Sequence, residues 1–387
     1  MLIRLVVGLV TFLCLFSSVA AQDKTSSTFG KGIRIVAKDS SFTMKFSTRI
    51  QTLYDGRLNL ETNDYNDRFL TRRARLKFDG FAYSPKLVYK IELAVASTDI
   101  AGGDSNEFGN TSRIILDAVL KWNFAPDWEL WVGQTKLPGN RERVISSQNL
   151  QFVDRSNVNS RFNIDRDAGI QLHYGKNKFN FVSSVSLGDG RNIVSNNVGG
   201  YDYTFRGEYL PFGEFKSGGD YFDSDLSREE KPKLSIGVTY DYNDRAYHEQ
   251  GQLGDALPAQ RDLETWFVDA HFKYNGWSSL LEYAHKTSPD GAAIFDGNGN
   301  FVDAFYTGEG ISWQAGYLFK NNFELAGRYT QVSPERVTLR NDNTQYTMGV
   351  SKYFVGHSLK IQGDVTLIKE DKRDDVLMNR LQVELSF

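Results

Sequence analysis

The sequence predicts an all-β fold, a transmembrane antiparallel β-barrel of sixteen strands, on three observations. Apolar and polar residues alternate with a period of two from Phe42 to the C-terminus, as expected for strands with two different faces. Tight turns alternate with long polar connections. The mean hydropathy is -0.42, and no later apolar run is long enough for a membrane helix. A barrel strand needs apolar residues only on its lipid face, so hydropathy windows miss it.

Residues 1–21 predict a signal peptide, with a short basic start, an apolar stretch and small residues before the expected cleavage point. A retained membrane anchor is the alternative, but the apolar stretch is shorter than the ~20 residues of a spanning helix. Residues 22–387 are then the barrel domain, and the expected location is the bacterial outer membrane. Cys14 is the single cysteine and lies in the signal, so we expect neither disulfides nor thiol chemistry.

The alternating segments can be placed in order along the chain. They begin near residues 42, 68, 86, 114, 128, 168, 178, 202, 233, 265, 277, 310, 323, 344, 357 and 376. An even number suits a closed bacterial barrel, and we expect residues 22 to 38 as a periplasmic lead-in. The tight turns include Ser84-Pro85, Asn275-Gly276 and Val355-Gly356. One connection, residues 211–232, is long where a tight turn is due, and the sequence offers no explanation for its length.

A soluble β-sandwich is the main alternative fold, because its strands also alternate. The second face of these segments argues against it, since it carries charges of both signs in strand interiors, as a wet lumen would allow. Aromatic residues at segment ends, such as Tyr54, Trp122 and Trp277, suit the interfacial girdles of a membrane barrel.

The third long connection, residues 136–167, is the candidate for a constriction, because many sixteen-stranded barrels fold this loop inward. Within residues 136–166 it holds six cations against three carboxylates, in a chain with 45 Lys and Arg and 48 Asp and Glu. The cations are Lys136, Arg141, Arg143, Arg155, Arg161 and Arg166. This contrast favours anions at the narrowest point.

The second strand adds further cations, with Arg73, Arg75 and Lys77 on one face. A ring of such side chains would select anions in a narrow passage. The alternative is that they pair with lumen carboxylates and brace the wall. Asp79, Glu92, Asp117, Asp269 and Glu282 are the candidate partners, and both interpretations stay open.

The sequence resembles the phosphate-selective porins O and P over almost the whole predicted domain. The resemblance lies in four stretches: Lys31–Arg34 through Arg49–Gln51, Thr71–Leu76 before Gly80, Val132–Lys136, and Gly169–Gln171. The last residues, 381–387, are shared with most outer-membrane barrels and indicate only the class.

The resemblance implies a site for anions. In the family a basic residue and two serines of the third loop, with an arginine eight residues further on, form the constriction. Arg143, Ser146, Ser147 and Arg155 stand at those positions here, with Arg143 in place of a lysine, and Arg72 and Arg73 match paired arginines of the second strand. We add Arg75 and Lys136 as further lumen cations. A family lysine of the third strand falls at Val88, beside Lys86 and Lys90.

The expected function is passive diffusion of small hydrophilic solutes, with a preference for anions such as phosphate. We expect a homotrimer surrounded by outer-membrane lipid and lipopolysaccharide, no cofactor or metal, no enzymatic activity and no nucleic-acid partner. Two alternatives stay open. One is a general, non-selective porin, which reversal potentials would distinguish. The other is a non-conducting structural or adhesive barrel.

Overall fold

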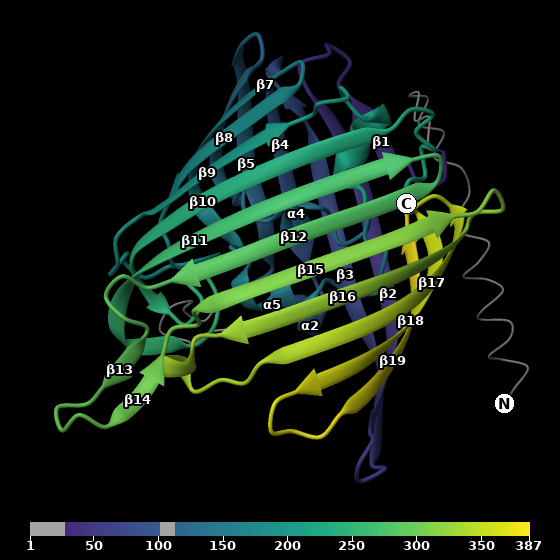
Figure 1. Ribbon diagram of the computed structural model, residues 1–387. Coiled ribbons are helices and arrows are strands. Elements are labelled where there is room, and N and C mark those ends of the chain that lie inside the picture. Colours follow the sequence, from purple (N-terminus) through teal and green to yellow (C-terminus); the bar gives the residue numbers. More distant parts are fainter. Residues whose placement is uncertain (1–27, 101–112) are drawn as a thin grey trace, which may run out of the picture.

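The computed structural model describes residues 28–100 and 113–387, which form one closed antiparallel barrel (Figure 1). The predicted signal peptide, residues 1–21, lies outside the described residues. The sixteen barrel strands are β2 (Thr43–Asn59), β3 (Tyr65–Ala82), β4 (Ser84–Ala94), β5 (Ile115–Ala125), β6 (Trp128–Lys136), β7 (Arg166–Lys176), β8 (Phe179–Ser186), β9 (Asp202–Tyr209), β10 (Lys233–His248), β11 (Ala256–Tyr274), β12 (Trp277–Thr287), β15 (Gly308–Leu318), β16 (Phe323–Pro334), β17 (Asn343–Val355), β18 (Leu359–Glu370) and β19 (Val376–Ser386). Each corresponds to a segment that the alternation predicts, so the predicted fold is confirmed.

The connections hold smaller elements. They are α2 (Ser97–Ile100), α4 (Arg141–Val144), α5 (Asn157–Phe162), η1 (Lys216–Tyr221), η2 (Arg336–Thr338) and the hairpin of β13 (Ala293–Phe295) with β14 (Phe301–Ala304). None of the described helices is long and apolar enough to cross a membrane.

The last strand closes the barrel against the first. β19 runs antiparallel along β2 and ends with Ser386 opposite Arg49. Beyond that point β1 (Ile33–Val36) takes the same edge of β2, with Ile33 opposite Phe46. The segment expected as a periplasmic lead-in therefore includes a strand, because the start of β2 extends past the end of β19 and leaves backbone groups to pair.

Tight turns join the strands at one end of the barrel, as the sequence predicts. Between β11 and β12, Tyr274 pairs with Trp277 across a two-residue turn. Asn275 and Gly276 both have positive φ, 47° and 89°. This is the conformation that Asn-Gly adopts readily and that matches the twist of the paired strands.

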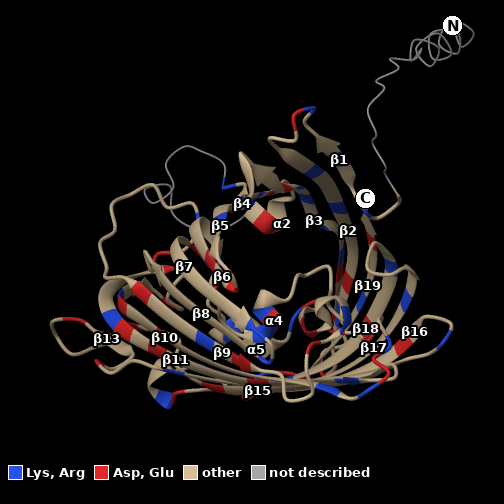
Figure 2. Ribbon diagram, turned by 90° about the horizontal axis from the view of Figure 1, so that it is seen from above, with Lys and Arg blue, Asp and Glu red and all other residues tan. Residues whose placement is uncertain are grey.

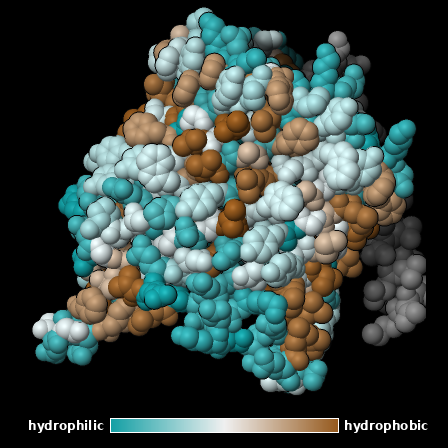
Figure 3. Space-filling model, viewed as in Figure 1, coloured by the Kyte–Doolittle hydropathy of each residue, from teal (hydrophilic) through white to brown (hydrophobic). Residues whose placement is uncertain are grey.

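The two faces of each strand differ in polarity as a membrane barrel requires, with polar residues inside and apolar residues outside. On β10, Ser235 and Thr239 point inward and are fully buried, whereas Ile236 and Val238 on the outer face are 38% and 43% exposed. A soluble sandwich would bury the apolar face instead. Figure 3 shows apolar patches over the strands of the outer surface and hydrophilic side chains at the loops below them.

The connection between β6 and β7, residues 137–165 and hereafter loop 3, lies within the ring of strands in the view from above (Figure 2). Its side chains bond the inner faces of distant strands. Asn140 Nδ2 donates to Glu282 of β12 at 2.8 Å, and Gln151 Nε2 donates to Glu324 of β16 at 2.7 Å. Loop 3 is therefore anchored to strands on the far side of the lumen, including β12 and β16.

The long connection between β9 and β10, residues 210–232 and hereafter the β9–β10 segment, also reaches the lumen. Lys273 Nζ on the inner face of β11 donates to the carbonyl of Gly219 at 2.7 Å. The carboxylate of Asp223 accepts the backbone N–H of Gln151 in loop 3 at 3.0 Å. The unusual length of this connection thus has a structural role, because it holds loop 3 from the end of the barrel that carries the tight turns.

Candidate functional site

A bulge in β3 brings two predicted site residues to loop 3. Arg72 Nε lies 3.0 Å and Arg73 Nη2 2.8 Å from the carboxylate of Asp154 in the loop. Neighbouring side chains of a regular strand point to opposite faces. The pairing with β2 joins Gln51 to Arg73 and then skips Arg72, which is an extra residue in β3. The β-bulge lets both arginines reach the same carboxylate.

Arg75 also faces the lumen, as the alternation predicts, and it meets two carboxylates. Its Nε and Nη2 lie 2.6 and 3.0 Å from the two oxygens of Asp99 in α2, and its Nη1 lies 3.0 Å from Glu92 of β4. Lys77 lies 3.0 Å from Asp79. For these wall cations, the structure shows the ion pairing that the sequence left open as the alternative to free anion-binding groups.

Two of the four predicted loop residues, Arg143 and Ser147, also have protein partners. Arg143 forms an ion pair with Asp165 at the end of loop 3. The hydroxyl of Ser147 accepts a hydrogen bond from Arg49 of β2 at 2.9 Å, and Ser147 is only 4% exposed. Ser146 is less buried and lines a cavity of the lumen.

Lys136 and Arg155 differ from the other predicted cations because their hydrogen bonds go to backbone carbonyls. Lys136 Nζ donates to the carbonyls of Arg143, Val144 and Ile145 at 2.7, 3.0 and 3.2 Å. Arg155 donates to the carbonyls of Glu142 and Ile145 at 2.7 and 2.6 Å. Within residues 28–100 and 113–387, neither side chain forms an ion pair with a carboxylate. Unlike the wall cations, they are therefore held by backbone dipoles and not by a direct ion pair.

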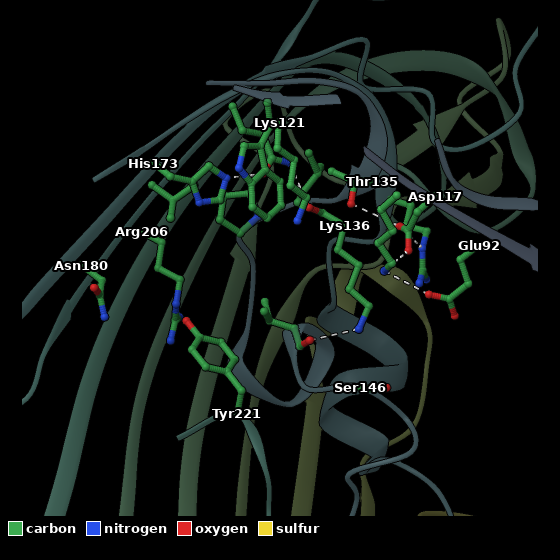
Figure 4. Close-up of a pocket in the computed structure, with 18 of the residues that line it drawn as sticks. Glu92, Asp117, Lys121, Thr135, Lys136, Ser146, His173, Asn180, Arg206 and Tyr221 are labelled. Atoms are coloured by element: carbon green, nitrogen blue, oxygen red, sulfur yellow. Dashed lines mark hydrogen bonds and ion pairs between the residues drawn. The ribbon is translucent and has the colours of Figure 1, made fainter. Parts of the chain in front are cut away.

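A cavity of about 360 Å³, hereafter the chamber, lies between loop 3 and the inner faces of β3 to β9 (Figure 4). Its wall holds six cations against three carboxylates. The cations are Arg75, Lys90, Lys121, Lys136, Arg166 and Arg206. Loop 3 and the β9–β10 segment contribute to the same wall through Ser146 and Tyr221. The chamber is thus the place where the predicted site residues Arg75, Lys136 and Ser146 come together.

Four of the chamber cations were not among the predicted site residues. Lys90 Nζ and Arg166 Nε both bond Asp117 of β5, at 2.6 and 3.0 Å. Lys121 lies directly opposite Trp131 on the neighbouring strand. The period-two alternation could have placed Lys90 and Lys121 in the lumen, since Lys90 shares its face of β4 with Val88, where the family has its lysine. Their meeting with loop 3 depends on the closed barrel.

A model of the phosphate-selective porin O and P family matches residues 45–385. The chain belongs to this family. The resemblance inferred from the sequence is confirmed, and the chain is an outer-membrane porin of the bacterial cell envelope.

Other comparisons agree with the fold of this porin. A protein of uncharacterised function from Aquifex aeolicus (strain VF5) is 24% identical over 395 residues, 92% of this chain and 90% of that protein. An anion-selective porin from Comamonas acidovorans superposes with a TM-score of 0.59 at 12% identity, covering 89% of this chain and all of the other. The outer membrane channel DcaP of Acinetobacter baumannii gives 0.58 at 14% identity, covering 91% and 99%.

Proposed function

We propose that this porin is a passive, water-filled channel with a preference for small anions, and that loop 3 forms its constriction. The observation that carries the proposal is the state of Lys136 and Arg155. Their cations face carbonyl oxygens and form no ion pair with a carboxylate of the described residues, whereas the wall cations Arg72, Arg73 and Arg75 are paired. An uncompensated cation in a narrow passage attracts anions and repels cations.

Passage requires that the anion be held weakly enough to leave. An anion in the field of Lys136 exchanges part of its water for N–H donors of Arg155 and for hydroxyls such as that of Ser146. The carbonyl oxygens that share these donors keep the attraction moderate. No energy input is required, since the concentration gradient sets the direction.

Arg155→Ala tests the constriction. In planar bilayers with a KCl gradient, wild-type channels should give a reversal potential of anion-selective sign. The variant should move that potential toward zero and weaken the block of chloride current by added phosphate. Arg161→Ala removes the same charge from a position beside Tyr306, outside the chamber, and should leave the potential unchanged.

The rival functions predict different results. A reversal potential near zero in the wild type, unaffected by Arg155→Ala, would leave a general porin. A silent bilayer with folded protein would favour a structural or adhesive barrel and would overturn the channel proposal.

We also propose a homotrimer, with residues 1–21 as the signal for export and lipid and lipopolysaccharide around the outer face. The similarity to OmpT of Vibrio cholerae in its trimer form supports the assembly, at 12% identity and a TM-score of 0.56. Cross-linking of the protein in outer-membrane vesicles should give a trimer band, and a monomer alone would contradict it.

A further inference from the structure

The chamber has an aromatic and apolar side that an inorganic anion does not need. Trp131, His173 and Val182 line it from β6, β7 and β8, and Tyr221 lines it from the β9–β10 segment. Leu137, Pro138 and Val144 of loop 3 complete this side. These side chains are on the lumen face, where the strands otherwise carry mainly polar residues. Apolar surface exposed to the water of a channel is unfavourable unless a solute covers it.

The aromatic rings of β6 and β7 form a fixed strip across these two strands, next to Lys121 of β5. The Trp131 and His173 rings stack with centroids 3.9 Å apart, and Lys121 Nζ lies 3.3 Å from the centroid of Trp131. Trp131 Nε1 donates to Glu129 at 2.7 Å, and His173 shares a hydrogen bond with Gln171 at 3.0 Å. A strip held from both sides loses little conformational freedom when it meets a solute.

Two cations of the chamber are suited to an anionic group. Lys136 and Lys121 form no ion pair with a carboxylate within residues 28–100 and 113–387, in contrast to Arg75, Lys90 and Arg166. Lys121 lies on the aromatic strip itself, and Figure 4 shows Lys121 above Lys136 at the same cavity. Cationic donors and apolar surface therefore face one small volume.

We propose that the chamber binds organic anions, molecules that carry a carboxylate or phosphate on a ring or other apolar body. The proposal rests on the proposed anion channel and names the class of solute that the channel favours. The anionic head would accept from Lys121 and lie in the field of Lys136, and the body would lie along Trp131 and Val182. A hydrated inorganic anion would leave the apolar side exposed and would lose hydrogen bonds against it. A cavity of about 360 Å³ is large enough for a solute with a single ring.

The test is the block of chloride current by benzoate, acetate and phosphate in planar bilayers. Benzoate should block the wild-type channel at about tenfold lower concentration than acetate, because it adds an apolar ring to the same carboxylate. Trp131→Gln should remove this difference and leave the block by acetate and phosphate unchanged. Trp131→Phe should retain most of it. Lys121→Met should weaken the block by benzoate and acetate alike.

Matched controls separate the site from general damage. Trp128→Gln changes the same residue type three positions earlier on β6, on the outer face, and should leave the benzoate preference intact. If Trp131→Gln does not fold, as judged by gel mobility with and without heating, Val182→Asn tests the same surface from β8 and should also abolish the preference.

The outcomes are distinguishable. Equal block by benzoate and acetate in an anion-selective wild type would overturn the organic-anion site and leave the proposed function standing. A benzoate preference that survives both Trp131→Gln and Val182→Asn would overturn the placement in the chamber. A wild type without anion preference would overturn the proposed function itself.

Discussion

At the residue scale, the sign of a charge in the lumen matters less than what neutralises it. Arg72, Arg73 and Asp154 form one cluster, which ties β3 to loop 3. Such a cluster holds the loop in position, but its opposite charges largely cancel, so it exerts little electrostatic force on a passing ion. Arg155, one residue further along the loop, donates to carbonyls and keeps its field. The two neighbouring residues therefore have different functions.

Asp154→Asn is expected to make the channel more anion-selective and the loop less firmly held, since Arg72 and Arg73 lose their carboxylate. Burial opposes ionisation of Asp154, but Arg73 and Arg72 outweigh it and hold the pKa of this carboxyl well below its ordinary value. The carboxyl therefore stays ionised and its ion pairs stay complete well below pH 4, and they weaken only as the pH falls through that lowered pKa. Reversal potentials of the wild type and of Asp154→Asn between pH 7 and pH 4 measure this, and the difference between them should stay constant.

The comparison with Asp154→Asn separates this carboxyl from others that titrate with ordinary pKa values. Those other groups should shift the wild type and the variant alike, and the wild type should not approach the behaviour of the variant above pH 4. Asp296→Asn, on the exposed β13–β14 hairpin, is the control and should behave as the wild type. A wild type whose reversal potential converges on that of Asp154→Asn by pH 4 would contradict the assignment.

At the element scale, two connections from opposite ends of the barrel meet in the lumen. Loop 3 enters from the end with long connections, and the β9–β10 segment enters from the end with tight turns. Asp223 N donates to the carbonyl of Asn149 at 3.0 Å, and Asn149 Nδ2 donates to the carbonyl of Tyr221 at 3.2 Å. Both contacts involve backbone atoms. They therefore depend on the backbone conformation of the two segments more than on single side chains.

Replacing residues 212–230 by a short Asn-Gly turn is expected to increase single-channel conductance and current noise. The change removes volume from the lumen and the support under loop 3, while the neighbouring strands keep their pairing. Conductance in 1 M KCl is the measurement. Deletion of the tip of the β13–β14 hairpin, residues 296–300, is the control and should change neither quantity. An unchanged conductance after the first replacement would show that the segment does not shape the passage.

At the scale of the whole molecule, the membrane decides which face of the barrel is apolar. Met348 on the outer face of β17 is 69% exposed, and Leu339 in an external connection is 71% exposed. The exposed fraction of the two side chains is therefore almost the same. Their surroundings differ, because β17 is expected to face lipid, where a charge near the bilayer midplane has no water to solvate it.

Met348→Arg is expected to lower the free energy of unfolding from lipid vesicles by about 2–4 kcal/mol. Leu339→Arg should change it by less than about 0.5 kcal/mol, as is usual for an exposed position in water. Urea titrations followed by tryptophan fluorescence measure both. Equal effects would place Met348 outside the membrane band and would contradict the orientation of β17.

The fold class and the number of barrel strands could be predicted from the sequence, because strand alternation and turn residues depend only on neighbouring residues. The family could be predicted from its four matching stretches. Asn275-Gly276 predicts its turn without any tertiary information, and the lumen side of Arg75 follows from counting along the strand. The predicted constriction residues of loop 3 remain a proposal.

The tertiary structure decided which charges are neutralised and where the chamber lies. The bulge that turns Arg72 toward loop 3 departs from alternation, so counting could not find it. Lys121 and Lys136 lie on the adjacent strands β5 and β6, but the chamber that they line also needs loop 3 and Tyr221, which the closed barrel brings to them. The role of the β9–β10 segment depends on its contacts with Gln151 and Lys273, residues far apart along the chain. Such contacts are set by the closed geometry, since the pairing of distant strands fixes which side chains share one volume.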